Sequence, residues 1–312
     1  MLNLNTYIGK LKLKNPVLVA SGTFGYAQEF SDFIDLRELG AIVTKTITLN
    51  PRQGNPAPRT CETPAGMLNS IGLENPGLEV FISEKLPFLV KTGVPVIVSI
   101  ASESGPQDFI ILARQLDKIK SVAAIELNIS CPNIKSHIAY RISHIAKLIA
   151  QDPKSTYEIV KSVRKVTHKT LITKLSPNVT DIVEIAQAAE SAGSDAVSLI
   201  NTLTGMSIDV ENHRPKIAAI TGGLSGPGIR PVAVRMVWEA YQKVNIPIIG
   251  MGGIMDTSSA LEFFLAGATA ISVGTANFIN PRATIEIIKG LKEYLIRNKI
   301  KDINSIVGSL KI

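Results

Sequence analysis

Residues 246–276 read IPIIGMGGIMDTSSALEFFLAGATAISVGTA, and the fold prediction depends on this stretch. Two short apolar runs, Ile246–Gly253 and Ala268–Ala276, flank an amphipathic segment. Continuous apolar runs joined by a crossover helix are typical of a parallel sheet that is buried on both faces. The stretch therefore predicts one β–α–β unit.

The same alternation extends towards the N-terminus. Six further strand candidates precede the quoted stretch: Val17–Gly22, Ala41–Thr48, Val94–Ala101, Ala123–Ser130, Thr170–Ser176 and Asp195–Leu203. Eight such units close most naturally into a (β/α)₈ TIM barrel. A doubly wound sheet is the alternative, but VLVASGTFGY follows where a G-x-G-x-x-G turn would be expected after the first strand. The opening KLKLKNP alternates polar and apolar residues, which predicts a short β extension, in the form of a hairpin at the barrel floor.

The segments between the strands carry helical signals. Ile182, Ile185, Ala186 and Ala189 are spaced as on one helix face, and Ile287, Leu291, Tyr294 and Leu295 indicate a closing helix. Ser155–Glu158 is interpreted as a capping box that opens the helix before the fifth strand. Asn50–Arg59 and Gly222–Pro231 are expected to be long βα loops. No domain boundary is evident, so residues 1–312 are expected to form a single domain.

Composition excludes several classes of protein. A hydrophobic content of 45% with 19% charged residues excludes disorder in a chain of 312 residues. The net charge of +7 (33 − 26) invites a nucleic-acid interpretation, but no dense stripe of Lys and Arg interleaves with aromatic residues, so a basic surface suited to anionic ligands is preferred.

Cys61 and Cys131 provide neither a disulfide framework nor metal-ligand spacing. With no signal-peptide pattern and no apolar run of ~18 residues, a cytoplasmic protein is expected.

Glycines follow the last two strands. Gly250, Gly252 and Gly253 end the seventh, and Gly274-Thr275 ends the eighth. In barrels these two loops commonly bind phosphate through backbone N–H groups, although glycine also serves tight turns. A third loop, Thr221–Pro227, could cover the same ligand.

Polar side chains gather at other strand ends. Lys45 and Lys174 end the second and fifth strands, where an anionic ligand would offset the cost of burying an ammonium group, although a lysine can also snorkel to the rim. Asn69, Asn128 and Asn201 offer the donors and acceptors that a polar heterocycle requires, although each alone is more often a turn residue.

Cys131 lies just past the fourth strand. Strand alternation places Glu126, Asn128 and Ser130 on one face, and Pro132 then fixes a turn. A lone cysteine is usually a small buried hydrophobe, and Cys61 is interpreted in that way. Beside the lysines, however, the Cys131 thiolate can act as a general base.

The motifs taken together resemble the class 1 dihydroorotate dehydrogenases. The matching segments, in order, are ASGTFGY, VTKTIT, NPAPR, NSIGLENPG, ELNISCPN, KLSPN, INTLTGM, TGGLSGP, PIIGMGGI and SVGTANF. INTLTGM and TGGLSGP look like the class 1B, NAD-linked branch. The resemblance covers nearly the whole chain.

This resemblance implies a barrel with one FMN that oxidises dihydroorotate to orotate, a step of UMP synthesis. Cys131 would take the C5 proton, and the C6 hydride would pass to flavin N5. The implied FMN contacts are Ser21, Lys45, Thr46, Ser99, Asn128, Lys174, Ile200, Gly226, Gly252, Gly253, Gly274 and Thr275. The implied orotate contacts are Lys45, Asn69, Ser70, Ile71, Gly72, Leu73, Asn128, Asn201 and Thr202.

The chain departs from the family pattern at two places. Ser99 stands where the family usually has Asn. The segment after Cys131 lacks the family's glycine pair; Lys135–Gln151 is expected to be a mobile lid, with a rigid helix carrying Ile142, Ile145, Ala146 and Ile149 as the alternative.

Other activities remain as alternatives. They are a fumarate-dependent class 1A enzyme, a dihydropyrimidine dehydrogenase-like enzyme and a flavin-free phosphate-binding barrel. With two cysteines the chain cannot supply about four ligands to an iron–sulfur cluster. The class 1B resemblance therefore implies a partner subunit carrying FAD and a 2Fe–2S cluster, in a heterotetramer built on a homodimer of this chain.

Overall fold

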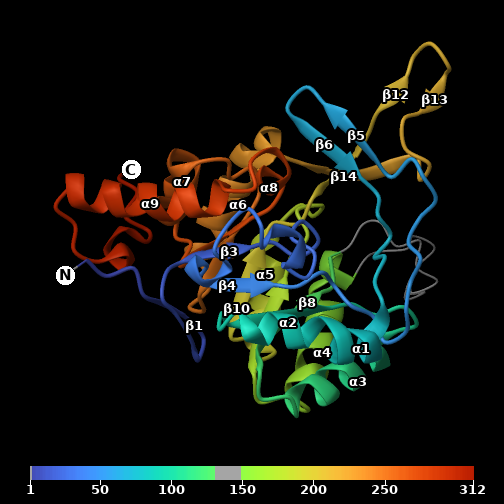
Figure 1. The fold of residues 1–312 in the computed structure, drawn as a ribbon, viewed down its shortest axis with the longest axis horizontal. Helices are drawn as coiled ribbons and strands as arrows, with labels where there is room; N and C mark the ends of the chain where they lie inside the picture. The colour runs from blue at the N-terminus through green and yellow to red at the C-terminus, as the bar shows by residue number, and fades with distance from the viewer. Residues whose placement is uncertain (1, 131–148) are drawn as a thin grey trace.

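The computed structural model describes residues 2–130 and 149–312 of the chain (Figure 1). The predicted base, Cys131, and residues 135–148 of the predicted lid lie outside the described residues. Within the described ranges, no helix combines the length and the apolar character needed to cross a bilayer.

Eight parallel strands form a closed barrel, in which each strand pairs with the next barrel strand along the chain and the last strand pairs with the first. They are β3 (Val17–Val19), β4 (Ala41–Val43), β7 (Val96–Ile100), β8 (Val122–Asn128), β9 (Thr170–Lys174), β10 (Ala196–Leu199), β15 (Ile248–Gly250) and β16 (Ala270–Val273). Apart from Ala123, every residue of these strands is buried, as a sheet covered on both faces requires. Seven of the eight predicted runs contain a barrel strand and the run Ala123–Ser130 overlaps β8, so the predicted (β/α)₈ barrel is confirmed.

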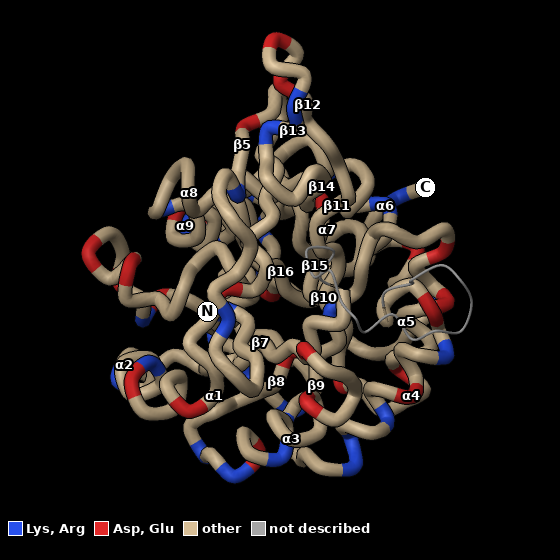
Figure 2. The backbone as a smooth tube through the Cα atoms, turned by 90° about the vertical axis from the view of Figure 1, so that its right-hand side faces the viewer, with Lys and Arg blue, Asp and Glu red and all other residues tan. Residues whose placement is uncertain are grey.

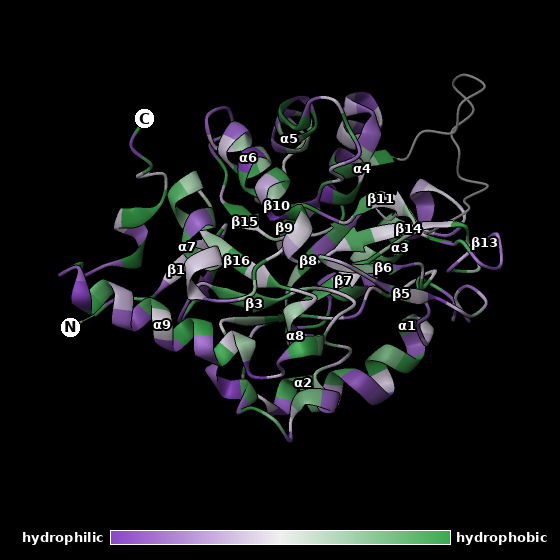
Figure 3. Ribbon diagram, turned by 90° about the horizontal axis from the view of Figure 1, so that it is seen from above, coloured by the Kyte–Doolittle hydropathy of each residue, from purple (hydrophilic) through white to green (hydrophobic). Residues whose placement is uncertain are grey.

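Helices connect the strands on the outside of the barrel. They are α1 (Gly77–Val80), the π-helical stretch η3 (Phe81–Lys85), α2 (Leu86–Lys91), α3 (Pro106–Asp117), α4 (Pro153–Arg164), α5 (Ile182–Ser191), α6 (Arg230–Tyr241), α7 (Thr257–Ala266), α8 (Ala276–Ile279) and α9 (Ala283–Arg297). The predicted face of α5 is buried, and the predicted closing helix is confirmed as α9, in which Tyr294 is only partly buried. Figure 3 shows α9 alternating between hydrophilic and hydrophobic residues along its length.

Two details of the predicted helices were wrong. The β3–β4 connection contains only short 3₁₀ turns, η1 (Gln28–Phe30) and η2 (Leu36–Glu38), because Asp35 caps the second turn and the chain enters β4 at once. Helix α4 starts at Pro153, and its N-cap is Asp152, whose carboxylate accepts from the Ser155 N–H. The expected box Ser155–Glu158 therefore lies inside the helix.

A hairpin closes the N-terminal end of the barrel. Strands β1 (Thr6–Ile8) and β2 (Leu11–Leu13) pair antiparallel. Ile8 and Leu13 are fully buried in one apolar cluster with the inward side chains of the barrel strands, such as Ile97 and Ile172. The predicted hairpin at the barrel floor is confirmed.

A four-stranded antiparallel sheet belongs to the loops at the opposite end. Its order is β11 (Leu203–Met206), β14 (Thr221–Ser225), β6 (Gly66–Asn69) and β5 (Thr60–Thr63). Between β11 and β14 the chain forms a second hairpin, β12 (Ile208–Asp209) with β13 (Arg214–Pro215), which projects from the molecule in Figures 1 and 2. Gly222–Pro231 belongs to the predicted long βα connection, between β10 and the helix that starts at Arg230, but part of it is regular structure, because Gly222–Ser225 completes the ladders with β11 and β6.

Candidate functional site

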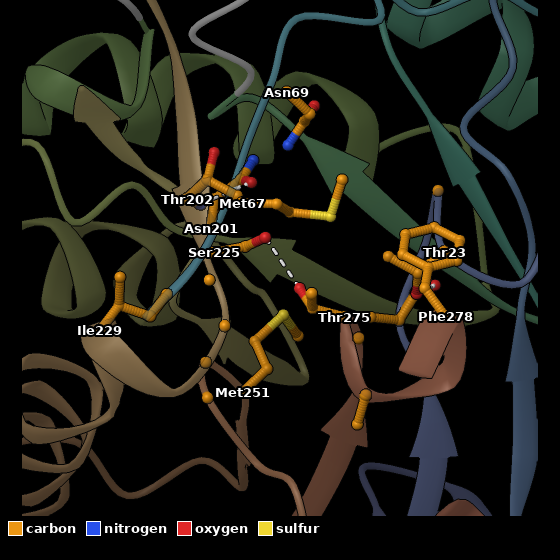
Figure 4. Close-up of a pocket in the computed structure, with 18 of the residues that line it drawn as sticks. Thr23, Met67, Asn69, Asn201, Thr202, Ser225, Ile229, Met251, Thr275 and Phe278 are labelled. Carbon is orange, nitrogen blue, oxygen red and sulfur yellow. Dashed lines mark hydrogen bonds between the residues drawn. The ribbon is translucent and has the colours of Figure 1, made fainter. Parts of the chain in front are cut away.

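A cavity of about 790 Å³ opens at the carboxyl ends of the barrel strands. Its walls come from the residues that follow β3, β4, β10, β15 and β16, from the last residues of β8 and β9, and from the β5–β6 hairpin. In (β/α)₈ barrels this end carries the active site. Figure 4 shows Met67 and Met251 projecting into the cavity and the hydrogen bond between Thr275 and Ser225, 2.8 Å long.

Two ammonium groups approach one short segment of the cavity wall. Lys174, at the end of β9, is only 5% exposed, and its Nζ donates to Ser21 Oγ over 3.2 Å. The Nζ of Lys45 lies 3.9 Å from the position that a Cβ at Gly22 would occupy. Burial of an ammonium group is costly unless an anion or a strong acceptor meets it. The two lysines therefore make this wall suited to an anionic or electron-rich ligand.

The glycine loops after β15 and β16 form a second wall. Within the described chain, the backbone N–H groups of Gly252, Gly253, Gly274 and Thr275 donate no hydrogen bond to the protein. A Cβ at Gly274 would meet nothing closer than 3.7 Å, and Gly274 has no left-handed φ, so the fold itself does not require glycine there. Free donors and a missing side chain leave room for an anion to approach the main chain. This wall fits a phosphate group.

Amide side chains line a third part of the cavity. Asn128 Nδ2 donates to Thr46 Oγ1 over 3.1 Å, and Asn201 Nδ2 donates to Ser130 Oγ over 2.9 Å. Asn69 Nδ2 donates to the carbonyl of Gly223 over 3.3 Å. A Cβ at Gly223 would lie 2.0 Å from Thr202 Oγ1, so glycine is needed there for Thr202 to reach the cavity.

Glu126 lies on the inner face of β8, as strand alternation predicted, but deeper in the barrel than Asn128. It is 1% exposed, and its Oε2 accepts from Ser198 Oγ over 3.0 Å.

Most of the predicted site residues meet at this cavity. Those on its walls are Ser21, Lys45, Thr46, Asn69, Ile71, Gly72, Leu73, Asn128, Lys174, Ile200, Asn201, Thr202, Gly226, Gly252, Gly253, Gly274 and Thr275. Ser70 and Ser99 do not line it. Ser70 is 1% exposed and accepts from Asn55 Nδ2, which fixes the loop behind the wall. Ser99 is fully buried and bonds to Thr46 Oγ1 over 2.9 Å, so the shorter side chain stops behind Thr46.

Several wall residues were not predicted from the sequence. Met67 and its neighbours in the β5–β6 hairpin cover one side, Met251 another, and Phe278 and Ile279 of α8 stand at the rim with 56% and 69% exposure. The Pro64-Ala65-Gly66 turn between two short polar–apolar runs was an available hairpin signal. Phe278 and Ile279 had no distinguishing signal, because isolated apolar residues are common on surfaces.

Comparison with known proteins agrees with this geometry. The family profile described as dihydroorotate dehydrogenase matches residues 3–295. The chain is 54% identical to a protein of Trichlorobacter lovleyi over 97% of each chain, and 52% identical to one of Thermoanaerobacter pseudethanolicus over the full length of both. A Geotalea daltonii protein is 53% identical over 99% of each chain. All three are named dihydroorotate dehydrogenase B (NAD(+)), catalytic subunit. This chain therefore belongs to the dihydroorotate dehydrogenase family, as its motifs predicted.

Proposed function

We propose that this chain is the FMN-dependent catalytic subunit of an NAD-linked dihydroorotate dehydrogenase, which oxidises dihydroorotate to orotate in UMP synthesis. The observation that carries the proposal is the meeting of two ammonium groups, three amide side chains and a glycine-lined anion wall in one cavity. The names of the relatives favour this class 1B branch over the fumarate-dependent alternative. A substrate without a carboxylate, as in the dihydropyrimidine dehydrogenase alternative, would not offer the lysines a carboxylate to bind.

The residues of the cavity walls support FMN as the cofactor. Gly252, Gly253, Gly274 and Thr275 would hold the FMN phosphate with backbone N–H groups, and Gly226 closes the same side. Lys174 would place its positive charge beside the flavin's electron-rich edge. Ser21 fixes this lysine through the 3.2 Å hydrogen bond. FMN, when bound, supplies the acceptor for the hydride that leaves C6 of dihydroorotate.

The substrate would lie between the lysine wall and the amide wall. Lys45 would face the carboxylate, because a charge-assisted hydrogen bond to an ammonium group is about twice as strong as a neutral one. Asn69, Asn128, Asn201 and Thr202 would bind the polar edge of the ring, supported by residues 70–73. Cys131, as thiolate, would take the C5 proton.

The remaining inferences concern assembly. We infer that residues 1–312 serve as one FMN-binding domain in the cytoplasm. A homodimer of this chain would join a partner subunit that carries FAD and a 2Fe–2S cluster, giving a heterotetramer that passes electrons to NAD.

The test combines two cysteine variants. Loss of a general base typically costs about 10²–10⁴-fold in rate, so Cys131→Ser should slow reduction of the bound FMN by dihydroorotate to that extent while the flavin stays bound. Cys61→Ser is the matched control, because Cys61 belongs to β5 and does not line the cavity. Anaerobic stopped-flow bleaching of the flavin is the measurement. A Cys131→Ser enzyme that bleaches at the wild-type rate, or a protein that binds no FMN, would overturn the proposal.

A further inference from the structure

Five side chains in or just after the strands β4, β7, β8 and β10 form one hydrogen-bonded chain along the amide wall. Asn201 Nδ2 is 2.9 Å from Ser130 Oγ, and Ser130 Oγ is 3.4 Å from Asn128 Oδ1. Asn128 Nδ2 is 3.1 Å from Thr46 Oγ1, which is 2.9 Å from Ser99 Oγ. Asn201, Asn128 and Thr46 line the cavity, whereas Ser130 and Ser99 are fully buried behind it.

A backbone group fixes the direction of this chain. The Thr202 N–H donates to Asn201 Oδ1 over 2.8 Å, and a backbone N–H can only donate. Asn201 must therefore turn its Nδ2 towards Ser130, where it meets both the carbonyl, at 3.3 Å, and the hydroxyl. Since Ser130 Oγ accepts from Asn201, its single proton is available for Asn128 Oδ1.

The same logic sets the second amide. With Oδ1 held by Ser130, Asn128 presents Nδ2 to Thr46, and one of its two N–H groups remains for a ligand. Asn201 directs its N–H groups at Ser130 and keeps an Oδ1 lone pair for a ligand. The Asn128 N–H donor and the Asn201 Oδ1 acceptor thus lie on either side of the Ser130 hydroxyl. This pair complements the adjacent N–H and C=O groups of a cyclic amide.

We propose that Ser130 is a positioning residue that transmits the fixed orientation of Asn201 to Asn128, and so determines which polar edge the site offers to its cyclic-amide substrate. The inference rests on the proposed function, since dihydroorotate and orotate supply that edge. Thr46 alone cannot fix the orientation of Asn128, because its hydroxyl can accept from the Asn128 N–H group or donate to the Asn128 oxygen equally well. Without the Ser130 hydroxyl, Asn128 can therefore rotate by 180° and present its oxygen where the ligand needs a donor.

The experiment is a double-mutant cycle on orotate affinity, measured from the flavin spectrum of the FMN-loaded protein. Ser130→Ala is expected to raise the orotate dissociation constant about tenfold. In an Asn128→Ala background the same substitution should have almost no effect, because Ser130 acts through Asn128. A general structural role for Ser130 would instead give equal effects in both backgrounds.

Ser194→Ala is the matched control. Ser194 is also a buried serine with side-chain hydrogen bonds, and it does not line the cavity. It should lower the thermal midpoint as much as Ser130→Ala does, with unchanged orotate affinity. Wild-type affinity in Ser130→Ala, or additive effects in the cycle, would overturn the role of Ser130. A wild-type FMN-loaded protein that binds no orotate would overturn the proposed function, and the inference with it.

Discussion

At the residue scale, glycines in this site serve two different needs. Gly223 is required by the protein, because a Cβ there would lie 2.0 Å from Thr202 Oγ1. Gly274 is not, since the nearest atom to its Cβ position is 3.7 Å away, and its missing side chain serves the cavity alone. Both residues are glycine, so only the atoms around each one show whether the fold or the cavity requires it.

This contrast predicts opposite outcomes for two substitutions. Gly274→Val should fold with a near wild-type thermal midpoint but bind FMN at least tenfold more weakly, because its side chain occupies the phosphate wall. Gly223→Ala should keep FMN and lose orotate affinity, because Thr202 must move. Calorimetry for stability and equilibrium dialysis for FMN are the measurements. Wild-type FMN affinity in Gly274→Val would show that the phosphate binds elsewhere.

The two lysines should also separate. Lys174→Ala should weaken FMN binding, whereas Lys45→Ala should also raise the orotate dissociation constant, each loss corresponding to roughly 1.5–3 kcal/mol for a charge-assisted hydrogen bond. Lys12→Ala is the control, because Lys12 is exposed in β2 at the opposite end of the barrel. An unchanged flavin spectrum and unchanged orotate affinity in both variants would contradict the anion-site interpretation.

From the sequence, residues that line the cavity were predicted more accurately than residues that lie behind its walls. Lys45 and Lys174 could be found because a charged residue at the end of an apolar strand is conspicuous. Ser70 and Ser99 were assigned through motif similarity, which does not tell whether a side chain reaches the cavity or stops behind another residue. In Ser99 the hydroxyl stops at Thr46.

At the scale of single elements, apolar runs located the strands but overstated their lengths. The run Val17–Gly22 contains β3, which ends at Val19; the Ala20 N–H still donates to the Val273 carbonyl of β16, and Ser21 and Gly22 then leave the ladder to line the cavity. Strand β14 was missed because Gly222 and Gly223 weaken any strand signal. Its partners β6 and β11 come from separate parts of the chain, so its pairing could not be seen locally.

A carboxylate that joins two elements gives a pH prediction. Asp117, the last residue of α3, accepts from the Thr167 hydroxyl and from the His168 N–H ahead of β9, over 2.8 and 2.7 Å. Burial raises the pKa of Asp117, but these hydrogen bonds and His168 outweigh burial and lower it to about 2. The unfolded-state pKa is about 3.9, so this stabilisation is present above pH ~4 and is lost as the pH falls towards 2.

Asp117→Asn should therefore lower the unfolding free energy by about 1–2 kcal/mol at pH 7, and the difference from wild type should shrink between pH 4 and pH 2. Urea unfolding across this pH range is the measurement. Asp32→Asn, at an exposed position of the β3–β4 connection, should change little. A difference that does not depend on pH would show that the charge of Asp117 is not what stabilises the junction.

At the scale of the whole molecule, the order of the barrel strands could be predicted from the sequence. Of the two structures that cover the ends of the barrel, only the hairpin at its floor could be predicted. Alternation in KLKLKNP indicated the floor hairpin, whose Ile8 and Leu13 complete the inner cluster. The sheet of β5, β6, β11 and β14 joins loops that are more than one hundred residues apart, for example through the pair Asn69 and Gly223. No local pattern encodes such a pairing, although it places Met67 and Thr202 at one cavity.

The last prediction concerns the electron acceptor of the isolated chain. Reduced FMN must be reoxidised before a second turnover. No G-x-G-x-x-G opens a βα unit for NAD, and two cysteines cannot supply about four ligands to an iron–sulfur cluster. We therefore expect the purified, FMN-loaded chain to oxidise dihydroorotate with an artificial dye but not with NAD or fumarate. Steady-state assays with each acceptor are the measurement, with the Cys131→Ser variant as the blank. Brisk fumarate turnover would place the chain in the class 1A branch instead, and NAD reduction by the chain alone would show that its dinucleotide site has no glycine-rich signature and that no partner subunit is needed to reach NAD.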